Sequence, residues 1–287
     1  MFPGTAVALL LTDAQISESI IPTAMAFCSL CLIASANYVI NEWLDREFDK
    51  HHPIKKNRPS ASGKVRGFYV AIEYSALVAG GLALAAQLPV EFIYFSILLL
   101  ISGIAYNVTP IRTKDRVYLD VLSEAINNPL RFMLGWSAIV SSSLPPSSIL
   151  LAYWMGGAFL MAIKRFAEYR HIGSPDQAGL YRRSFRFYTE ESILVSAFFY
   201  GLCSSLFLGI FLIKYRIEFL FSFPFFALLF AWYLSIGLRS SSTAQTPEKL
   251  YRERRFIAYL VLLVCILIAL FVVDIPYIDG LLEPSEY

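Results

Sequence analysis

The sequence predicts an all-α fold, a polytopic helix bundle that spans a membrane. Hydrophobic residues make up 57% of the 287 residues and charged residues only 16%, which leaves too little polar surface for a soluble domain of this length. The apolar residues also gather into segments close to the roughly 20 residues that cross a hydrocarbon core about 30 Å thick. No soluble domain or long low-complexity linker separates these segments, so we expect a single integral membrane domain over residues 1–287.

The apolar segments define the expected elements in order. The first, Phe2–Leu11, is too short to cross a membrane and lacks the basic region and cleavage site of a secretory signal, so we expect a short or truncated first helix. Eight segments of about spanning length follow: Ser19–Ile40, Gly67–Leu88, Glu91–Tyr106, Leu119–Val140, Ser148–Ala167, Ser192–Ile213, Phe219–Leu238 and Phe256–Val273. We therefore expect eight full spans and one short helix around a central cavity.

Basic residues predict how the bundle is oriented. Most Lys and Arg lie in the four connections near Ile40, Tyr106, Ala167 and Leu238, whereas the alternate connections carry little charge and the tail after Val273 is acidic. Because Lys and Arg concentrate in cytoplasmic loops, we predict a multi-pass protein of the cell membrane whose active-site loops face the cytoplasm, with the C-terminus on the opposite side. The net charge of +2 gives no indication of nucleic-acid binding.

The most charged stretch carries a stripe of acids and amides. In NYVINEWLDREFD (37–49) the polar residues Asn37, Asn41, Asp45 and Asp49 recur every four positions. Such positions turn by only about 40° around a helix, so they share one face at the cytoplasmic end of a span. Two carboxylates and an amide suit Mg²⁺, which keeps several waters and shares its other sites with substrate phosphates. We predict that Asn41, Asp45 and Asp49 hold Mg²⁺ and that the two aspartates are catalytic.

A structural interpretation of these acids stays open. Asp45 and Asp49 could merely pair with the neighbouring Arg46 and Lys50 on the helix surface. We favour the metal site because acids within membrane spans are costly and usually functional.

The same stretch resembles a known family. NEWLDREFD has the NxxxDxxxD form of the UbiA superfamily of intramembrane prenyltransferases, and KKNRPSASG resembles the KxxRPxxxG loop that follows it. Within the superfamily, residues 35–65 are most similar to the decaprenyl-phosphate phosphoribosyltransferase branch, and segments 162–170, 181–194 and 247–255 favour the same branch. The resemblance covers about residues 35–273. It implies a membrane transferase that uses Mg²⁺, a diphosphate substrate and an isoprenoid lipid. The segment YNVTPIRTKDRVYLDV (106–121) departs from that branch and is closer to tetrapyrrole and quinone prenyltransferases. The branch usually begins with a basic, aromatic first helix, and we expect that this chain starts too late to contain one.

The segment AIKRFAEYR (162–170) differs from prenyl-diphosphate users of the superfamily. Those enzymes typically carry a second DxxxD motif here, whereas this chain has only Glu168, beside Lys164 and Arg165. Cations at this position can bind phosphate oxygens directly. We therefore expect Glu168 to act in catalysis and the two cations to bind substrate. The alternative is that Lys164 and Arg165 are ordinary anchors at the end of a span.

A second polar face lies between these clusters. Asp120, Glu124, Asn128 and Arg131 recur at helical spacing in an otherwise apolar segment, and Pro129 permits a kink. We expect this face to line a polar cavity and to bind substrate. The alternative is a Glu124–Arg131 or Asp120-centred pair that only joins helices.

These predictions favour one reaction and leave two alternatives. Further candidate substrate-binding residues lie in the two loops that follow the first and third full spans: Lys56, Arg58, Tyr106, Asn107, Arg112 and Lys114. The favoured function is Mg²⁺-dependent transfer of 5-phosphoribose from phosphoribosyl diphosphate to a polyprenyl phosphate. The same residues suit transfer of a prenyl group from a prenyl diphosphate to an aromatic or lipid acceptor. A transporter or structural membrane protein is the third possibility.

Overall fold

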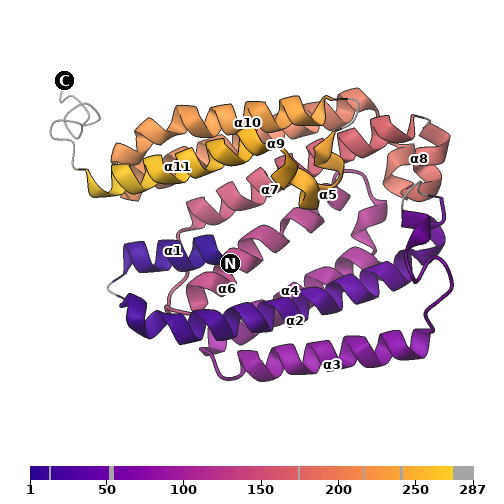
Figure 1. Cartoon of the computed structure of the whole chain (residues 1–287), viewed down its shortest axis with the longest axis horizontal. Helices are drawn as coiled ribbons and strands as arrows, with labels where there is room; N and C mark the ends of the chain where they lie inside the picture. The colour runs from indigo at the N-terminus through magenta and orange to yellow at the C-terminus, as the bar shows by residue number, and fades with distance from the viewer. Residues whose placement is uncertain (13, 52–54, 174, 216, 240–241, 274–287) are drawn as a thin grey trace.

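The protein is a bundle of helices. The computed structural model describes residues 1–273 apart from 13, 52–54, 174, 216 and 240–241, and no β-strand occurs among these residues (Figure 1). Seven of the described helices are long and apolar enough to cross a membrane: α2 (Ile16–Asp49), α3 (Gly67–Ala85), α4 (Val90–Asn107), α7 (Ser147–Ile172), α9 (Glu190–Tyr215), α10 (Phe223–Gly237, with its apolar segment starting at Ile217) and α11 (Arg254–Val272). The predicted all-α membrane fold is confirmed.

The predicted span Leu119–Val140 is instead two short helices, α5 (Leu119–Ala125) and α6 (Asn127–Ser137), so the described residues do not contain the eighth full span that we expected. Pro129 lies in the first turn of α6 and has no backbone N–H, which removes a helical hydrogen bond at the junction. The break places the amide side chains of Asn127 and Asn128 at the start of a new helix, within the bundle.

The first helix is short, as predicted. Helix α1 (Phe2–Leu11) packs against α6, and the Thr5 hydroxyl donates a hydrogen bond to the carbonyl of Gly135 over 3.2 Å. Two elements of less than spanning length therefore pack against each other.

Two of the three apolar clusters of the described residues lie on either side of the centre of the bundle. Ile33 of α2, Leu99 of α4 and Leu134 of α6 belong to one cluster, and Phe166 of α7 and Ile193 of α9 belong to the other. Figure 1 shows the same division, with α2, α3 and α4 on one side, α9, α10 and α11 on the other, and α5, α6 and α7 between them. Close packing of this kind is the main source of helix association within a bilayer.

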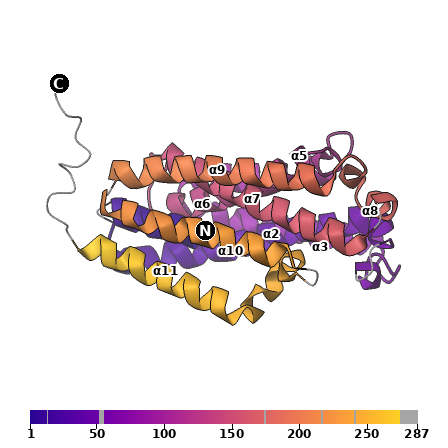
Figure 2. The same cartoon turned by 90° about the horizontal axis from the view of Figure 1, so that it is seen from above.

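The basic connections lie toward one end of the bundle. The segments between α2 and α3, α4 and α5, and α7 and α9 meet at the right-hand end of Figure 1 and contain η1 (Lys55–Asn57), η2 (Thr113–Asp115), α8 (Pro175–Tyr181) and η3 (Arg183–Arg186). The connection from α10 to α11, with η5 (Thr243–Gln245) and η6 (Pro247–Arg252), extends toward the same end, as the view from above also shows (Figure 2). Their cytoplasmic location stays a prediction, and the tail 274–287 lies outside the described residues.

Candidate active site

A polar cavity of about 480 Å³ lies between the two halves of the bundle. Asn37, Asn41, Asp45 and Asp49 all line it, so the four-residue repeat does form one face of α2. Helix α2 continues to Asp49 without interruption, and this continuity carries the stripe from the apolar region to the basic loops. The residues proposed from their spacing alone thus share one enclosed space.

Cations from two different loops hold the aspartates of α2. Arg58 donates a hydrogen bond to Asp49 over 2.9 Å, and the Arg112 guanidinium lies 3.0 Å from Asp45. Lys114 also binds Asp45. The suggested pairing of the aspartates with Arg46 and Lys50 is not observed, because both of these cations pair with Glu47 instead.

The side-chain oxygens of α2 are suitable ligands for a magnesium ion that is also bound by substrate phosphates. Asn41, Asp45 and Asp49 supply amide and carboxylate oxygens to one cavity, the ligand chemistry that hard divalent cations prefer. Among the described residues no group of three His, Cys, Asp or Glu side chains could enclose a metal by itself. These residues could therefore hold an ion only in part, with water and substrate oxygens completing its coordination.

Lys114 and Asn107 form the wall behind Asp45. Lys114 is 3% exposed and donates hydrogen bonds to the side-chain oxygens of Asn107 over 2.6 Å and of Asn41 over 3.2 Å. Burial lowers the pKa of Lys114 to about 8, although the Asp45 carboxylate acts in the opposite direction. Arg112 is also buried, and its guanidinium donates to the carbonyl of Asn107. The loop after α4 is thus fixed to the acidic stripe.

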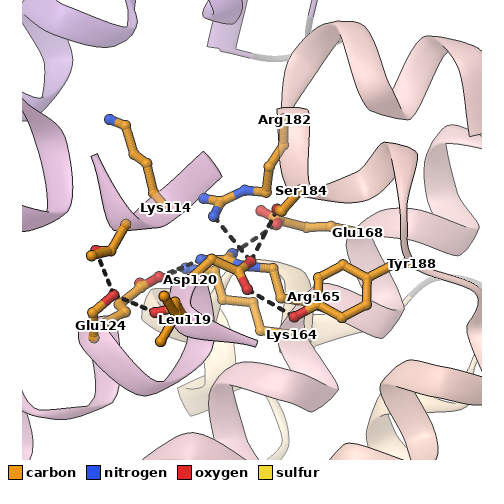
Figure 3. Close-up of polar contacts among 12 residues, drawn as sticks. Lys114, Leu119, Asp120, Glu124, Lys164, Arg165, Glu168, Arg182, Ser184 and Tyr188 are labelled. Carbon is orange, nitrogen blue, oxygen red and sulfur yellow. Dashed lines mark hydrogen bonds and ion pairs between the residues drawn. The ribbon is translucent and has the colours of Figure 1, made fainter. Parts of the chain in front are cut away.

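Arg165 is the centre of a second charged cluster (Figure 3). Its guanidinium contacts three carboxylates: Asp120 at 3.5 Å, Glu168 at 3.0 Å, and Glu124. The side chain is only 1% exposed, so Arg165 is not an ordinary interfacial anchor. Lys164 lines the cavity with its ammonium group 3.9 Å from Glu124. Prenyl-diphosphate users of the superfamily typically carry a second DxxxD motif in this segment. This chain has a buried guanidinium there instead.

Asp120 lies behind the cavity wall and is fully buried. It accepts hydrogen bonds from Ser184 over 3.1 Å and Tyr188 over 2.8 Å, and Arg182 lies 3.5 Å away. Figure 3 shows these side chains converging from α5 and from the segment that leads into α9. The Asp120-centred pair, which was the structural alternative in the sequence analysis, is thus present. Asp120 has no exposed surface with which to contact substrate.

Glu168 is buried as well and does not line the cavity. It is 4% exposed and lies between Arg165 and Lys55, whose ammonium group is 3.4 Å away. Burial lowers the pKa of Lys55, but the Glu168 carboxylate and Tyr181 outweigh this effect, so the pKa is raised. In this arrangement Glu168 holds a cation in place instead of facing a reacting group.

Several cavity residues, Asn127 among them, were missed in the sequence. Lys55, Tyr181 and Arg182 line the cavity, and Lys55 donates a hydrogen bond to the Tyr181 hydroxyl. In the sequence, Lys55 and Arg182 could be identified only as basic residues of loops. By contrast, Lys56, which we predicted to bind substrate, is exposed and does not line the cavity.

The inner end of the cavity is polar. Asn127, Asn128 and Arg131 of α6 line it, together with Tyr106, whose hydroxyl donates to Glu124 over 2.8 Å. Close helix approach creates this wall: a Cβ atom on Gly157 of α7 would lie 2.0 Å from the amide nitrogen of Asn128. The predicted polar face of the broken segment thus contributes Glu124, Asn128 and Arg131 to the cavity.

Comparisons with known proteins agree with this architecture. The chain matches the sequence model of the UbiA prenyltransferase family over residues 1–261. A UbiA homologue from Archaeoglobus fulgidus, solved bound to DMAPP and Mg²⁺, aligns with a TM-score of 0.67 and 20% identity over 94% of both chains. The same homologue was also solved with GPP and Mg²⁺, again with a TM-score of 0.67. These structural likenesses show a shared fold.

Curated relatives have different activities. Nodulation protein NoeC of Azorhizobium caulinodans is 29% identical over 194 residues, covering 66% of this chain and 60% of that protein. A decaprenyl-phosphate phosphoribosyltransferase of Mycobacterium tuberculosis is 31% identical over 174 residues, covering 60% and 55%. A protoheme IX farnesyltransferase of Bacillus mycoides is 25% identical over 181 residues, covering 61% and 58%. The matches therefore span less than two thirds of each relative.

Proposed function

The chain belongs to the UbiA prenyltransferase family, and we propose that it is a membrane transferase that moves 5-phosphoribose from phosphoribosyl diphosphate to a polyprenyl phosphate. Membership of a prenyltransferase family supports an enzyme over the transporter and structural-protein alternatives. The proposal concerns the donor and the acceptor, for which the relatives give different examples.

The excess of cations around the cavity carries this proposal. Among the described residues, three acids line it, Asp45, Asp49 and Glu124, against the basic side chains Lys55, Arg58, Arg131, Lys164, Arg165 and Arg182. Phosphoribosyl diphosphate carries a diphosphate and a 5-phosphate, and the lipid acceptor carries another phosphate. Fixed Arg and Lys side chains bind such oxyanions through charge-assisted hydrogen bonds. Two polyanionic substrates therefore match this cavity better than a single prenyl diphosphate with a neutral acceptor.

In the proposed reaction the α2 end holds the donor. Asn41, Asp45 and Asp49 would hold Mg²⁺, which neutralises charge on the departing diphosphate when it is bound. Arg58, which lines the cavity beside Asp49, would bind diphosphate oxygens. An oxygen of the polyprenyl phosphate forms the new bond to the anomeric carbon as the bond to diphosphate breaks. The nucleophile is already anionic, so positioning and electrostatic stabilisation account for catalysis without a strong general base.

Prenyl transfer is the second candidate. The loop 106–121 resembles tetrapyrrole and quinone prenyltransferases, a farnesyltransferase is among the relatives, and the Archaeoglobus homologue binds prenyl diphosphates. The same aspartates would then serve an allylic diphosphate whose carbocation is captured by an aromatic or lipid acceptor.

A parallel assay separates the two candidates. Purified protein with Mg²⁺ receives polyprenyl phosphate and phosphoribosyl diphosphate in one mixture, and a prenyl diphosphate with aromatic acceptors in the other. Mass spectrometry of the lipid products should show phosphoribosylated polyprenyl phosphate in the first mixture. Product in the second mixture alone would refute phosphoribosyl transfer and support prenyl transfer.

A further inference from the structure

Arg131 differs from every other basic side chain of the cavity. Each of the others has a carboxylate within ion-pair distance: Lys55 with Glu168, Arg58 with Asp49, Lys164 with Glu124, Arg165 with Glu124 and Glu168, and Arg182 with Asp120. Among the described residues, no hydrogen bond or ion pair holds the guanidinium of Arg131, although the side chain lines the cavity.

The position of Arg131 makes this lack of a partner costly. Arg131 lies on α6, which packs against α1, α4 and α7 inside the bundle, and its side chain lines the inner end of the cavity. Arginine keeps its proton in proteins, and a charge at such depth is expensive unless an opposite charge accompanies it. The protein does not supply that charge within its described residues, so the site calls for an anion brought by a ligand.

Neighbouring amides extend the site. Asn127 accepts a hydrogen bond from the Ser102 hydroxyl over 2.9 Å through its side-chain oxygen, which leaves the amide N–H groups available as donors. Asn128 stands on the same wall, pressed against Gly157. A guanidinium and two amides supply hydrogen-bond donors suited to a phosphate or another oxyanion.

An apolar pocket begins next to these donors. It has a volume of about 390 Å³ and shares Asn128 with the polar cavity. Its walls come from α7, α9, α10 and α11 and include Tyr153, Phe159, Leu208 and Phe230. A ligand that places an anionic group on Arg131 therefore has a hydrocarbon-lined space beside it, an arrangement that fits an amphiphile with one charged end.

We propose that Arg131, with Asn127 and Asn128, binds the phosphate of the polyprenyl phosphate acceptor, and that the first isoprene units of this lipid lie in the apolar pocket. This inference rests on the proposed function and assigns the two substrates to different ends of one cavity. The donor diphosphate belongs to the α2 end, where Asp45 and Asp49 can share a cation with it. The acceptor belongs to the α6 end, which has donors for an oxyanion and where no carboxylate of the described residues lies within ion-pair distance of Arg131.

Lipid binding tests this assignment without turnover. The full chain in neutral phosphatidylcholine nanodiscs is titrated with a polyprenyl phosphate and with the polyprenol of the same length. The wild type should bind the phosphate at least about tenfold more tightly, and Arg131→Gln should remove most of that preference, because a charge-assisted hydrogen bond contributes about one to two orders of magnitude in affinity. Arg66→Gln, the same chemical change at an exposed residue outside the cavity, should leave the preference unchanged.

Two further measurements exclude other roles for Arg131. Because the guanidinium lacks a protein partner, Arg131→Gln should melt at or above the wild-type temperature, whereas a structural arginine would destabilise the fold when removed. Phosphatidylglycerol or inorganic phosphate at equal concentration should not displace the polyprenyl phosphate. The assignment would be overturned if Arg131→Gln kept the phosphate preference or melted below the wild type. It would also be overturned if either competitor displaced the polyprenyl phosphate from the wild type.

The binding result is independent of the reaction assay. Arg131-dependent binding of polyprenyl phosphate in a protein that makes no phosphoribosylated product would preserve the acceptor site and refute the proposed donor. Phosphoribosyl transfer with an unchanged KM for polyprenyl phosphate in Arg131→Gln would preserve the proposed function and refute the acceptor site.

Discussion

Arg58 donates a hydrogen bond to Asp49 over 2.9 Å, so the loop after α2 folds back onto the last residue of that helix. Asp45, one turn earlier, binds Arg112 and Lys114 from the loop after α4. Each aspartate of the stripe is therefore held by a cation from a separate loop. A bound metal ion would pair with the two aspartates, and a bound diphosphate would pair with the cations that the aspartates release. No buried charge would then be left unpaired.

The first prediction concerns the aspartates. Asp45→Asn and Asp49→Asn should each slow turnover by on the order of a thousandfold, because each removes a ligand that contributes several kcal/mol to transition-state stabilisation. Steady-state rates at increasing Mg²⁺ concentration, with thermal melting as a check on folding, measure the effect.

Glu47→Gln provides the matched control. Glu47 lies between the two aspartates on the same helix but is exposed and pairs with Lys50. Its variant should keep wild-type turnover. If both aspartate variants retained near-normal turnover that still depends on Mg²⁺, the metal site would be refuted.

The second prediction distinguishes the roles of the adjacent cations Arg165 and Lys164. Arg165→Met should lower the free energy of unfolding by about 3–5 kcal/mol, because it leaves the buried Asp120 and Glu168 without their shared partner. Lys164→Met should leave stability nearly unchanged, since its ammonium group is 3.9 Å from Glu124, and should instead raise the KM for a phosphorylated substrate about 10- to 100-fold. Thermal melting and steady-state kinetics distinguish the two variants. Equal melting temperatures would contradict the structural role of Arg165.

A third prediction tests the contact between α2 and α4. An added Cβ on Gly103 would lie 2.3 Å from the side-chain oxygen of Asn37, which lines the cavity. Gly103→Ala should therefore destabilise the fold by about 1–3 kcal/mol and displace Asn37. Gly209→Ala, where a Cβ meets nothing within 4 Å, should be neutral or slightly stabilising because alanine favours helix. Equal melting temperatures for the two variants would exclude the tight contact.

Helical spacing made much of the site predictable. The repeat from Asn41 to Asp49 depends only on the geometry of one helix, and all of its members line the cavity. The polar face with Glu124 and Arg131 was predictable for the same reason, even though the segment proved to be two helices.

Contacts between distant segments could not be predicted from the spacing of residues in the sequence. Asp120 and Glu168 looked like cavity residues, but each is buried against partners that lie far away in the sequence, Tyr188 and Lys55. Arg182 looked like one of several loop cations, and only the packing of its loop over α5 brings it to the cavity. Whether a charged side chain faces a cavity or a buried partner depends on tertiary packing.

The last prediction concerns orientation. The connections that contain Lys56 and Lys249 lie toward the same end of the bundle, and the α6–α7 connection with Ser141 lies at the other end (Figure 1). In a chain whose own cysteines are replaced, Lys56→Cys and Lys249→Cys should react with a membrane-impermeant maleimide only when the reagent reaches the cytoplasmic face, because basic loops are retained there. Ser141→Cys, an exposed position, should react only from the opposite face. Labelling of positions 56 and 249 from different faces would contradict the arrangement of the bundle, whereas labelling of both from the outer face would keep the arrangement and reverse its orientation.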